Sequence, residues 1–126
     1  MTSCYTLKIA TDFAAAHALR NYAGECSRLH GHNWKVEVEV KASTLDAAGM
    51  GIDFKVIRDA AKSLASDLDH RNLNDLVPFD STNPTAENIA AYFFHGLSDT
   101  LNNDRVNVSA ITIWETERAC VRYTED

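Results

Sequence analysis

Three histidines and one cysteine lie close together in the sequence and are suited to binding a metal ion. His17, His30 and His32 fall within sixteen positions, and Cys26 lies between the first and second of them. On a strand, residues two apart point to the same face, so His30 and His32 are expected to share one face. Buried imidazoles need a partner, and a metal ion provides one. Three histidine ligands with a fourth position left open are the pattern of a catalytic zinc ion.

Two other interpretations of this cluster stay open. Histidine pairs of the form His-x-His also occur as core or surface residues whose ring nitrogens make ordinary hydrogen bonds. A closed structural site of three histidines is a second alternative, with Cys26 as the fourth ligand. The catalytic interpretation is favoured because a cysteine four residues before a strand-borne His-Gly-His lies near the metal without having to bind it.

Two strands are predicted in the first third of the chain. Apolar and charged residues alternate from Trp34 to Lys41, which is typical of a half-buried strand that begins near the two histidines. A shorter alternation predicts a first strand that runs from Tyr5 towards Phe13. The segment from about Ala14 to Leu29 is expected to be an irregular connection, and loops of this length are usually functional.

Two helices are predicted in the middle of the chain. Asp53 is suited to cap the first helix, which follows a turn with two glycines at residues 45–51. Thr85 is suited to cap the second helix, and Glu87 is favourable in its first turn. The buried faces of the two helices are expected to carry Ile57, Ala60, Leu64 and Leu68 in the first, and Ile89, Phe93, Leu97 and Leu101 in the second.

The predicted order of elements defines the fold class. Residues Val106 to Glu115 and Ala119 to Tyr123 are predicted as two further strands joined by a short turn. The order is then β-β-α-α-β-β, which is typical of two helices packed on an antiparallel four-stranded sheet. The sequence therefore predicts an α+β fold.

Asp69 and His70, at the predicted end of the first helix, are a second candidate for chemistry. A protonated histidine is favourable at a helix C-terminus, so a purely structural role is one interpretation. In the other, the carboxylate holds one tautomer of the imidazole and the pair carries protons. Adjacent residues of a helix do not face each other, so this second role requires the helix to have ended before Asp69.

Glu115 is a third candidate, since it continues the apolar parity of Ile111 and Ile113 along a strand. A carboxylate on a buried face requires hydrogen-bond donors. The 2-amino group and ring N–H of a pterin or guanine offer two donors side by side. The alternative is a frayed strand end at which Glu115 lies in solvent.

Length and composition exclude several classes of protein. The 126 residues are expected to form one domain, 1–126, and their 45% hydrophobic and 24% charged content is that of an ordinary globular protein. No apolar run approaches a membrane span and no signal sequence is visible, so no membrane partner is expected. Three widely spaced cysteines argue against a disulfide framework and for a reducing, cytoplasmic compartment. The net charge of -6 disfavours nucleic acid, while a small anionic substrate stays open.

Seven short motifs, in order and at compatible spacing, resemble the 6-pyruvoyl tetrahydropterin synthase and 6-carboxytetrahydropterin synthase family. Each motif is modest, but together they cover nearly the whole chain and are highly specific. The compact length most resembles the bacterial 6-carboxytetrahydropterin synthase branch. The motifs are Phe13-Ala14-Ala15-Ala16-His17, Cys26-Ser27-Arg28-Leu29-His30-Gly31-His32, Ile52-Asp53-Phe54, Leu68-Asp69-His70, Asn74-Asp75, Asn83-Pro84-Thr85-Ala86-Glu87-Asn88 and Trp114-Glu115-Thr116.

The resemblance implies a fold, an assembly and an activity. The fold is the tunnelling fold, or T-fold, assembled as a homo-hexamer (a dimer of trimers) with one zinc ion per subunit and active sites between subunits. The implied reaction converts 7,8-dihydroneopterin triphosphate to 6-carboxy-5,6,7,8-tetrahydropterin, with release of acetaldehyde and triphosphate, in the biosynthesis of queuosine and other 7-deazapurines. Two alternatives stay open: a 6-pyruvoyl tetrahydropterin synthase, which keeps the side chain, and a zinc-stabilised pterin-binding module without catalysis.

The resemblance also implies roles for individual residues. His17, His30 and His32 match the zinc ligands. Cys26 matches the catalytic cysteine that moves protons on the substrate side chain, although Glu25 beside it occupies a region where one branch uses a glutamate instead. The remaining matches are a proton-transfer pair at Asp69 and His70, a pterin anchor at Glu115, and a residue that lines the pterin pocket at Glu87.

Overall fold

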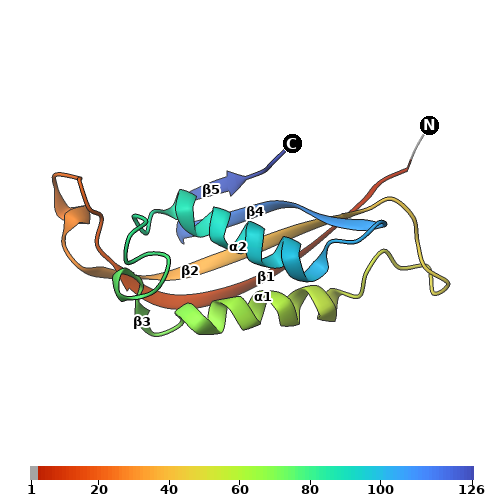
Figure 1. Ribbon diagram of the computed structural model, residues 1–126, viewed down its shortest axis with the longest axis horizontal. Coiled ribbons are helices and arrows are strands. Elements are labelled where there is room, and N and C mark those ends of the chain that lie inside the picture. Colours follow the sequence, from red (N-terminus) through yellow and green to blue (C-terminus); the bar gives the residue numbers. More distant parts are fainter. Residues whose placement is uncertain (1–2) are drawn as a thin grey trace.

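The computed structural model describes residues 3–126 and shows one long, twisted sheet with two helices on the same face (Figure 1). The α+β class predicted from the sequence is confirmed. Two short 3-10 helices, η1 and η2, lie at Glu25–Ser27 and Leu73–Asp75. The helices and strands are β1 Tyr5–His17, β2 His30–Ala42, α1 Phe54–Leu68, β3 Arg71–Asn72, α2 Ala86–Leu101, β4 Val106–Thr116 and β5 Ala119–Tyr123.

Within residues 3–126 the sheet has five strands in the order β3-β1-β2-β4-β5, one more than the sequence predicts. The pairs β1–β2, β2–β4 and β4–β5 are antiparallel, as expected. The additional strand, β3, pairs in parallel with Ala15 and Ala16 of β1. The prediction of a purely antiparallel four-stranded sheet is therefore wrong at this edge, because two residues are too few to show an alternating pattern.

The first strand is longer than predicted, since β1 continues through Ala14–Ala16 to His17 instead of ending near Phe13. Three consecutive alanines carry no contrast in hydropathy, so the sequence shows no alternation there. The structure nevertheless alternates, and the side chains of Ala15 and His17 are buried. The irregular connection therefore begins after His17, and this histidine lies on a strand directly opposite His30.

The helices begin where their capping residues predict. The Asp53 carboxylate accepts a hydrogen bond from the Lys55 amide at 2.8 Å, and the Thr85 hydroxyl accepts one from the Asn88 amide at 3.1 Å. The predicted stripe of α2 is fully buried. In α1 the buried face is rotated slightly from the prediction, because Ala61 and Ala65 are buried while Ala60 and Leu64 are only partly covered.

The core lies between the two helices and the apolar face of β1, β2 and β4. The four apolar residues that alternate along β2 are completely buried: Trp34, Val36, Val38 and Val40. Burying side chains of this size stabilises a fold by roughly 1.5–3 kcal/mol each. This layer supplies a rigid base for the histidine end of β1 and β2. No helix within residues 3–126 has the length and apolarity needed to cross a membrane.

Candidate active site

The structure brings His17, His30 and His32 together at one end of the sheet. His17 pairs with His30 across β1 and β2, and His32 lies two residues further along β2. One ring nitrogen from each histidine lies within 4.8 Å of the others. The ring centroids are 4.5 Å apart for His17 and His30 and 4.8 Å apart for His30 and His32. The shared face predicted from the His-Gly-His spacing thus becomes a compact three-imidazole cluster.

Hydrogen bonds to backbone carbonyls determine which ring nitrogens remain available. His17 Nδ1 lies 2.7 Å from the Pro84 oxygen, and His30 Nδ1 lies 2.7 Å from the Arg28 oxygen. A carbonyl oxygen only accepts, so both Nδ1 atoms donate a proton and both Nε2 atoms carry a lone pair. The Nε2 atoms of His17 and His32 are buried without a hydrogen-bond partner among the described residues. These are the properties of metal-binding imidazoles whose orientation is fixed by the surrounding protein.

Burial favours the neutral form of His17 and His32. Desolvation lowers the pKa of His17 below its ordinary value, although the bond to Pro84 opposes the shift. Desolvation also lowers the pKa of His32, although the charge of Glu115 opposes that shift. Neutral imidazole is the form that binds metals. The donor set and its protonation state therefore fit a zinc ion.

Two of the three histidines, His17 and His32, pack against the buried ring of Trp34. The Trp34 ring lies 4.9 Å from that of His17 and 5.2 Å from that of His32, in edge-to-face contact with both. Trp34 itself stacks on Phe13, and its Nε1 donates a hydrogen bond to the Ala15 carbonyl at 3.2 Å. His17 and His32 therefore pack against a buried aromatic layer.

Cys26 lies near this cluster in the fold but is not part of it. The cysteine is in the 3-10 helix η1, is half-buried, and is a free thiol. Its carbonyl accepts a hydrogen bond from the Leu19 amide at 2.9 Å, which joins η1 to the chain just after His17. The ligand cluster found among residues 3–126 comprises the three imidazoles without this thiol. The geometry thus favours an open fourth position over a closed four-ligand site.

Asp69 and His70 form the close pair that the sequence interpretation requires. Helix α1 ends at Leu68, and His70 adopts a left-handed backbone conformation with φ of 59°. This turn brings His70 Nδ1 to 3.0 Å from the Asp69 carboxylate. The other carboxylate oxygen of Asp69 accepts a hydrogen bond from the Ala14 amide at 2.8 Å. The Ala14 amide, and next to it His70, hold the pKa of Asp69 below its ordinary value.

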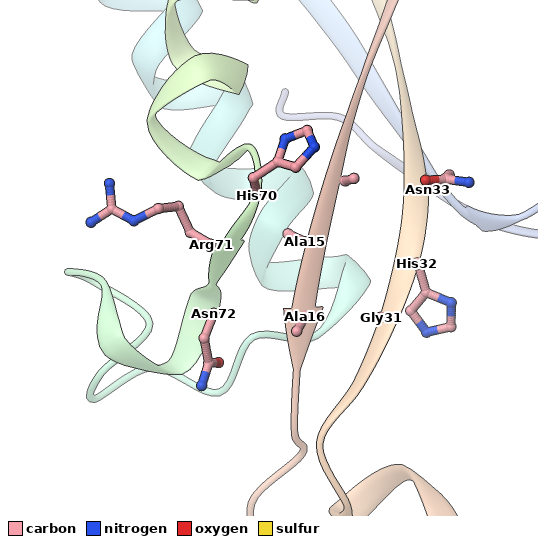
Figure 2. Close-up of a pocket in the computed structure, with 9 residues that line it drawn as sticks. Ala15, Ala16, Gly31, His32, Asn33, His70, Arg71 and Asn72 are labelled. Carbon is pink, nitrogen blue, oxygen red and sulfur yellow. The ribbon is translucent and has the colours of Figure 1, made fainter.

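His70 and His32 line the same open cavity, which has a volume of about 530 Å³. In Figure 2 the two rings lie apart, with the ribbons of β1 and β2 between them. The His70 side chain is 83% exposed, so it is free to meet a substrate. Cys26, Glu87 and Glu115 are not on the wall of this cavity. The wall of this cavity in a single chain therefore carries only some of the candidate residues.

Glu115 lies beside the histidines at an irregularity in β4. The register of β4 and β5 shifts between Trp114 and Thr116, and the Glu115 side chain turns towards the cluster. Its carboxylate is 3.7 Å from His32 Nε2 and is partly buried. This position agrees with the parity predicted from Ile111 and Ile113, and not with a strand end frayed into solvent.

Glu87 is exposed in the first turn of α2, as its predicted place in the helix requires. Its side chain makes no hydrogen bond or ion pair within the described part of the chain. It lies three residues after Pro84, whose carbonyl holds His17. Glu87 is therefore connected to the site through the start of α2, which lies just after Pro84 in the chain.

Three residues that were not predicted from the sequence support the site: Asn74, Asn83 and Pro84. Asn74 and Asn83 hydrogen-bond the backbone that follows His17, and Pro84 fixes the ring of His17. The available signal was their position in motifs shared with the pterin synthases, Asn74-Asp75 and the segment that starts at Asn83.

One family model and several relatives match this chain over most of its length. The model of the family described as 6-pyruvoyl tetrahydropterin synthase matches residues 6–126. A Synechocystis protein named 6-carboxy-5,6,7,8-tetrahydropterin synthase is 34% identical over 116 residues, covering 88% of this chain and 86% of its own. A Pyrococcus furiosus protein named dihydroneopterin monophosphate aldolase is 34% identical over 103 residues, covering 82% of each chain.

A solved structure extends this agreement to the fold. The structure of Caenorhabditis elegans 6-pyruvoyl tetrahydropterin synthase matches with a TM-score of 0.87 and 27% identity, covering 99% of this chain and 98% of that one. The match confirms the tunnelling fold that the sequence motifs imply. This chain belongs to the 6-pyruvoyl tetrahydropterin synthase family.

Proposed function

We propose that this tetrahydropterin synthase is a zinc-dependent 6-carboxytetrahydropterin synthase. Its reaction converts 7,8-dihydroneopterin triphosphate and water to 6-carboxy-5,6,7,8-tetrahydropterin, acetaldehyde and triphosphate, in the cytoplasm and on the route to queuosine. The observation that carries the proposal is the cluster of three imidazoles beside a carboxylate, in which the buried Nε2 atoms of His17 and His32 have no hydrogen-bond partner among the described residues. The name of the Synechocystis relative supports the choice of product.

His17, His30 and His32 would hold the zinc ion through their Nε2 atoms. For His17 and His30 the opposite nitrogen already donates to a carbonyl, so each ring is oriented before a metal arrives. When bound, zinc would polarise hydroxyl and carbonyl oxygens of the substrate side chain. The fourth position stays open for these oxygens because Cys26 lies outside the cluster.

Cys26 and His70 are the proposed proton carriers. As a thiolate, Cys26 would take a proton from a side-chain carbon of the substrate. His70 would exchange the complementary proton through Nε2, since its Nδ1 is held by Asp69. Asp69 stays ionised because the Ala14 amide stabilises its charge, so it keeps the imidazole in one tautomer and orientation.

Glu115 would anchor the pterin by accepting hydrogen bonds from its 2-amino and ring N–H groups. We expect Glu115→Gln to weaken substrate binding by roughly 2–4 kcal/mol, because one charged hydrogen bond is lost and an amide donor then faces a donor. The same contacts exist in the ground and transition states, so KM should rise while kcat changes little. Steady-state kinetics measures both constants.

Glu117→Gln is the matched control, since Glu117 is exposed two residues further along the chain and its replacement should leave both constants unchanged. A Glu115→Gln variant that kept a normal KM and lost only kcat would contradict the anchor role. Glu115 would then be a proton-transfer residue.

A homo-hexamer, a dimer of trimers, is the proposed assembly. In the described part of a single chain, both outer strands of the sheet, β3 and β5, have no second neighbouring strand, and such edges are commonly closed by oligomerisation. In one chain the cavity that His70 lines holds neither Cys26 nor Glu115, and residues of a neighbouring subunit would complete it. Sedimentation velocity should therefore show a species six times the chain mass of 14.0 kDa.

Complementation provides a second test of this assembly. Hexamers mixed from inactive Cys26→Ala and His70→Ala subunits should recover part of the activity if each site takes residues from two subunits. A protein that stays monomeric at micromolar concentration, or mixed oligomers without any activity, would count against shared sites.

Product analysis tests the proposed reaction. The zinc-loaded protein is incubated with 7,8-dihydroneopterin triphosphate, and the pterin is identified by mass spectrometry alongside an acetaldehyde assay. We expect 6-carboxytetrahydropterin and acetaldehyde in equal amounts. A 6-pyruvoyl product without acetaldehyde would establish the second candidate, which the C. elegans structure favours.

Dihydroneopterin monophosphate serves as the comparison substrate, because the Pyrococcus relative is named for an aldolase activity on it. Faster turnover of the monophosphate than of the triphosphate would contradict the proposal. Substrate binding without turnover of either compound would identify a non-catalytic pterin-binding module.

A further inference from the structure

Two asparagine side chains hold the chain immediately after His17. The Ala18 amide donates to Asn74 Oδ1 at 2.8 Å, and Asn74 Nδ2 donates to the Ala18 carbonyl at 2.9 Å. Asn83 makes the same pair of bonds to Arg20, at 2.9 Å from the Arg20 amide and 3.0 Å to its carbonyl. Each side-chain amide therefore satisfies both backbone groups of one residue.

These side chains replace a neighbouring strand. A primary amide presents a donor and an acceptor side by side, so it meets the N–H and C=O that an extended residue directs to one edge. Strand β3 pairs with this edge of β1 at Ala15 and Ala16, and Asn74 and Asn83 continue the pairing two and four residues further along the chain from Ala16. The outer edge of the sheet thus extends past the last residue of β1.

Further hydrogen bonds hold the two segments that carry these side chains. The backbone amide of Asn74 donates to Asn72 Oδ1 at 3.1 Å. The Asn83 carbonyl accepts from Asn88 Nδ2 at 2.9 Å, which ties it to the first turn of α2. The residue after Asn83 is Pro84, whose carbonyl accepts the hydrogen bond from His17 Nδ1. One short segment therefore holds the ring of His17 and the backbone of Arg20.

The opposite edge of the Ala18–Arg20 backbone is hydrogen-bonded to the candidate catalytic cysteine, Cys26. Leu19 lies between the two clamped residues, and its amide donates to the Cys26 carbonyl at 2.9 Å. The chain from Ala18 to Arg20 is thus paired on both sides, with the asparagines on one edge and η1 on the other. A displacement of this segment would move His17 and Cys26 together.

We propose that Asn74 and Asn83 are positioning residues that pre-form the metal site and place Cys26 beside it. This inference rests on the proposed metal-binding role of the three histidines. The asparagines act through the Ala18–Arg20 backbone, without contacting the metal or the substrate. Residues that orient metal ligands in this way typically contribute 10- to 100-fold to metal affinity.

Asn74→Asp and Asn83→Asp, alone and combined, test the inference with almost no change in shape. Each carboxylate keeps the acceptor for the backbone amide but turns the Nδ2 donor into an oxygen that faces a carbonyl. We expect the double variant to bind Co²⁺ alone about 10- to 100-fold more weakly than the wild-type protein, as measured by the visible absorption of the bound ion. Thermal unfolding of the metal-free variants, followed by circular dichroism, shows whether they fold.

Asn103→Asp is the matched control, because the Asn103 side chain only accepts, from the amides of Arg105 and Val106, and lies outside the site. It should bind Co²⁺ as the wild-type protein does. Folded Asn74→Asp and Asn83→Asp variants with wild-type affinity would overturn the positioning role. A wild-type protein that binds no Co²⁺ would overturn the metal site itself and this inference with it, and the two failures are distinct.

Hydrogen exchange on the wild-type protein gives a test that needs no variant. If the clamp and the metal site stabilise each other, bound Co²⁺ must slow exchange of the Ala18 and Arg20 amides. The Val108 amide is the control, because it also donates to an asparagine side chain, Asn102, at 2.8 Å but lies on β4. We expect at least about tenfold slower exchange at Ala18 and Arg20 and a smaller change at Val108. Equal changes at all three amides would contradict the inference.

Discussion

Replacing His30 with alanine is expected to remove the bound zinc and, with it, all measurable turnover. The variant leaves two imidazoles, which hold zinc far more weakly than three. Because changes to residues that merely orient a ligand cost 10- to 100-fold in affinity, loss of the ligand itself should cost more than about 100-fold. His30 is the best choice of the three, since His17 is only 1% exposed and its removal would also disturb the packing against Trp34.

Zinc content per chain, measured by plasma mass spectrometry, reads out this prediction. We expect about one zinc per chain in the wild-type protein and none in His30→Ala. The control is His95→Ala, because His95 is an exposed histidine on α2 that pairs with Glu125 instead of a metal. Cys26→Ala should keep its zinc. Loss of zinc from Cys26→Ala would instead support the closed structural site with Cys26 as the fourth ligand. Full zinc content in His30→Ala would contradict the three-histidine centre.

Cys26→Ala and His70→Ala are each expected to lower kcat by roughly 10²–10⁴-fold, with little change in KM. The thiol and the imidazole act while protons move, so their removal falls on the chemical step and not on substrate binding. Rapid-quench and steady-state measurements on the zinc-loaded variants separate the effect on the chemical step from the effect on substrate binding. Cys120→Ala is the control, since Cys120 is an exposed thiol on β5. A His70→Ala variant with normal kcat would make the Asp69–His70 pair a structural feature of the turn after α1.

Much of the fold follows from local signals in the sequence. Asp53 and Thr85 identify the starts of the helices because a capping side chain needs only the next few amides. Trp34 and the alternating valines identify β2 because one face is buried and the other is not. The extension of β1 through its alanines has no such signal, since neither face changes in polarity. The two residues of β3 become a strand only because β1 lies beside them.

In the candidate site, too, some contacts can be predicted from local sequence patterns and others cannot. His30 and His32 share a face by strand geometry alone, so their meeting is predictable from a spacing of two. Glu115 continues a parity visible in its own strand, which places it on the apolar face, and the structure adds its position 3.7 Å from His32. The bonds from Asn74 and Asn83 join residues 56 and 63 positions apart. No local pattern encodes such contacts, and they become visible only when the chain is folded.

The most direct test of the central claim is a metal titration of turnover. Zinc is removed with a chelator and returned in steps, and the conversion of 7,8-dihydroneopterin triphosphate is measured at each ratio of zinc to chain. The three-histidine centre predicts no turnover without metal and a linear rise that saturates at about one zinc per chain. His95→Ala should follow the same line, whereas His30→Ala should stay inactive at every ratio. Full activity in the metal-free protein would contradict the account.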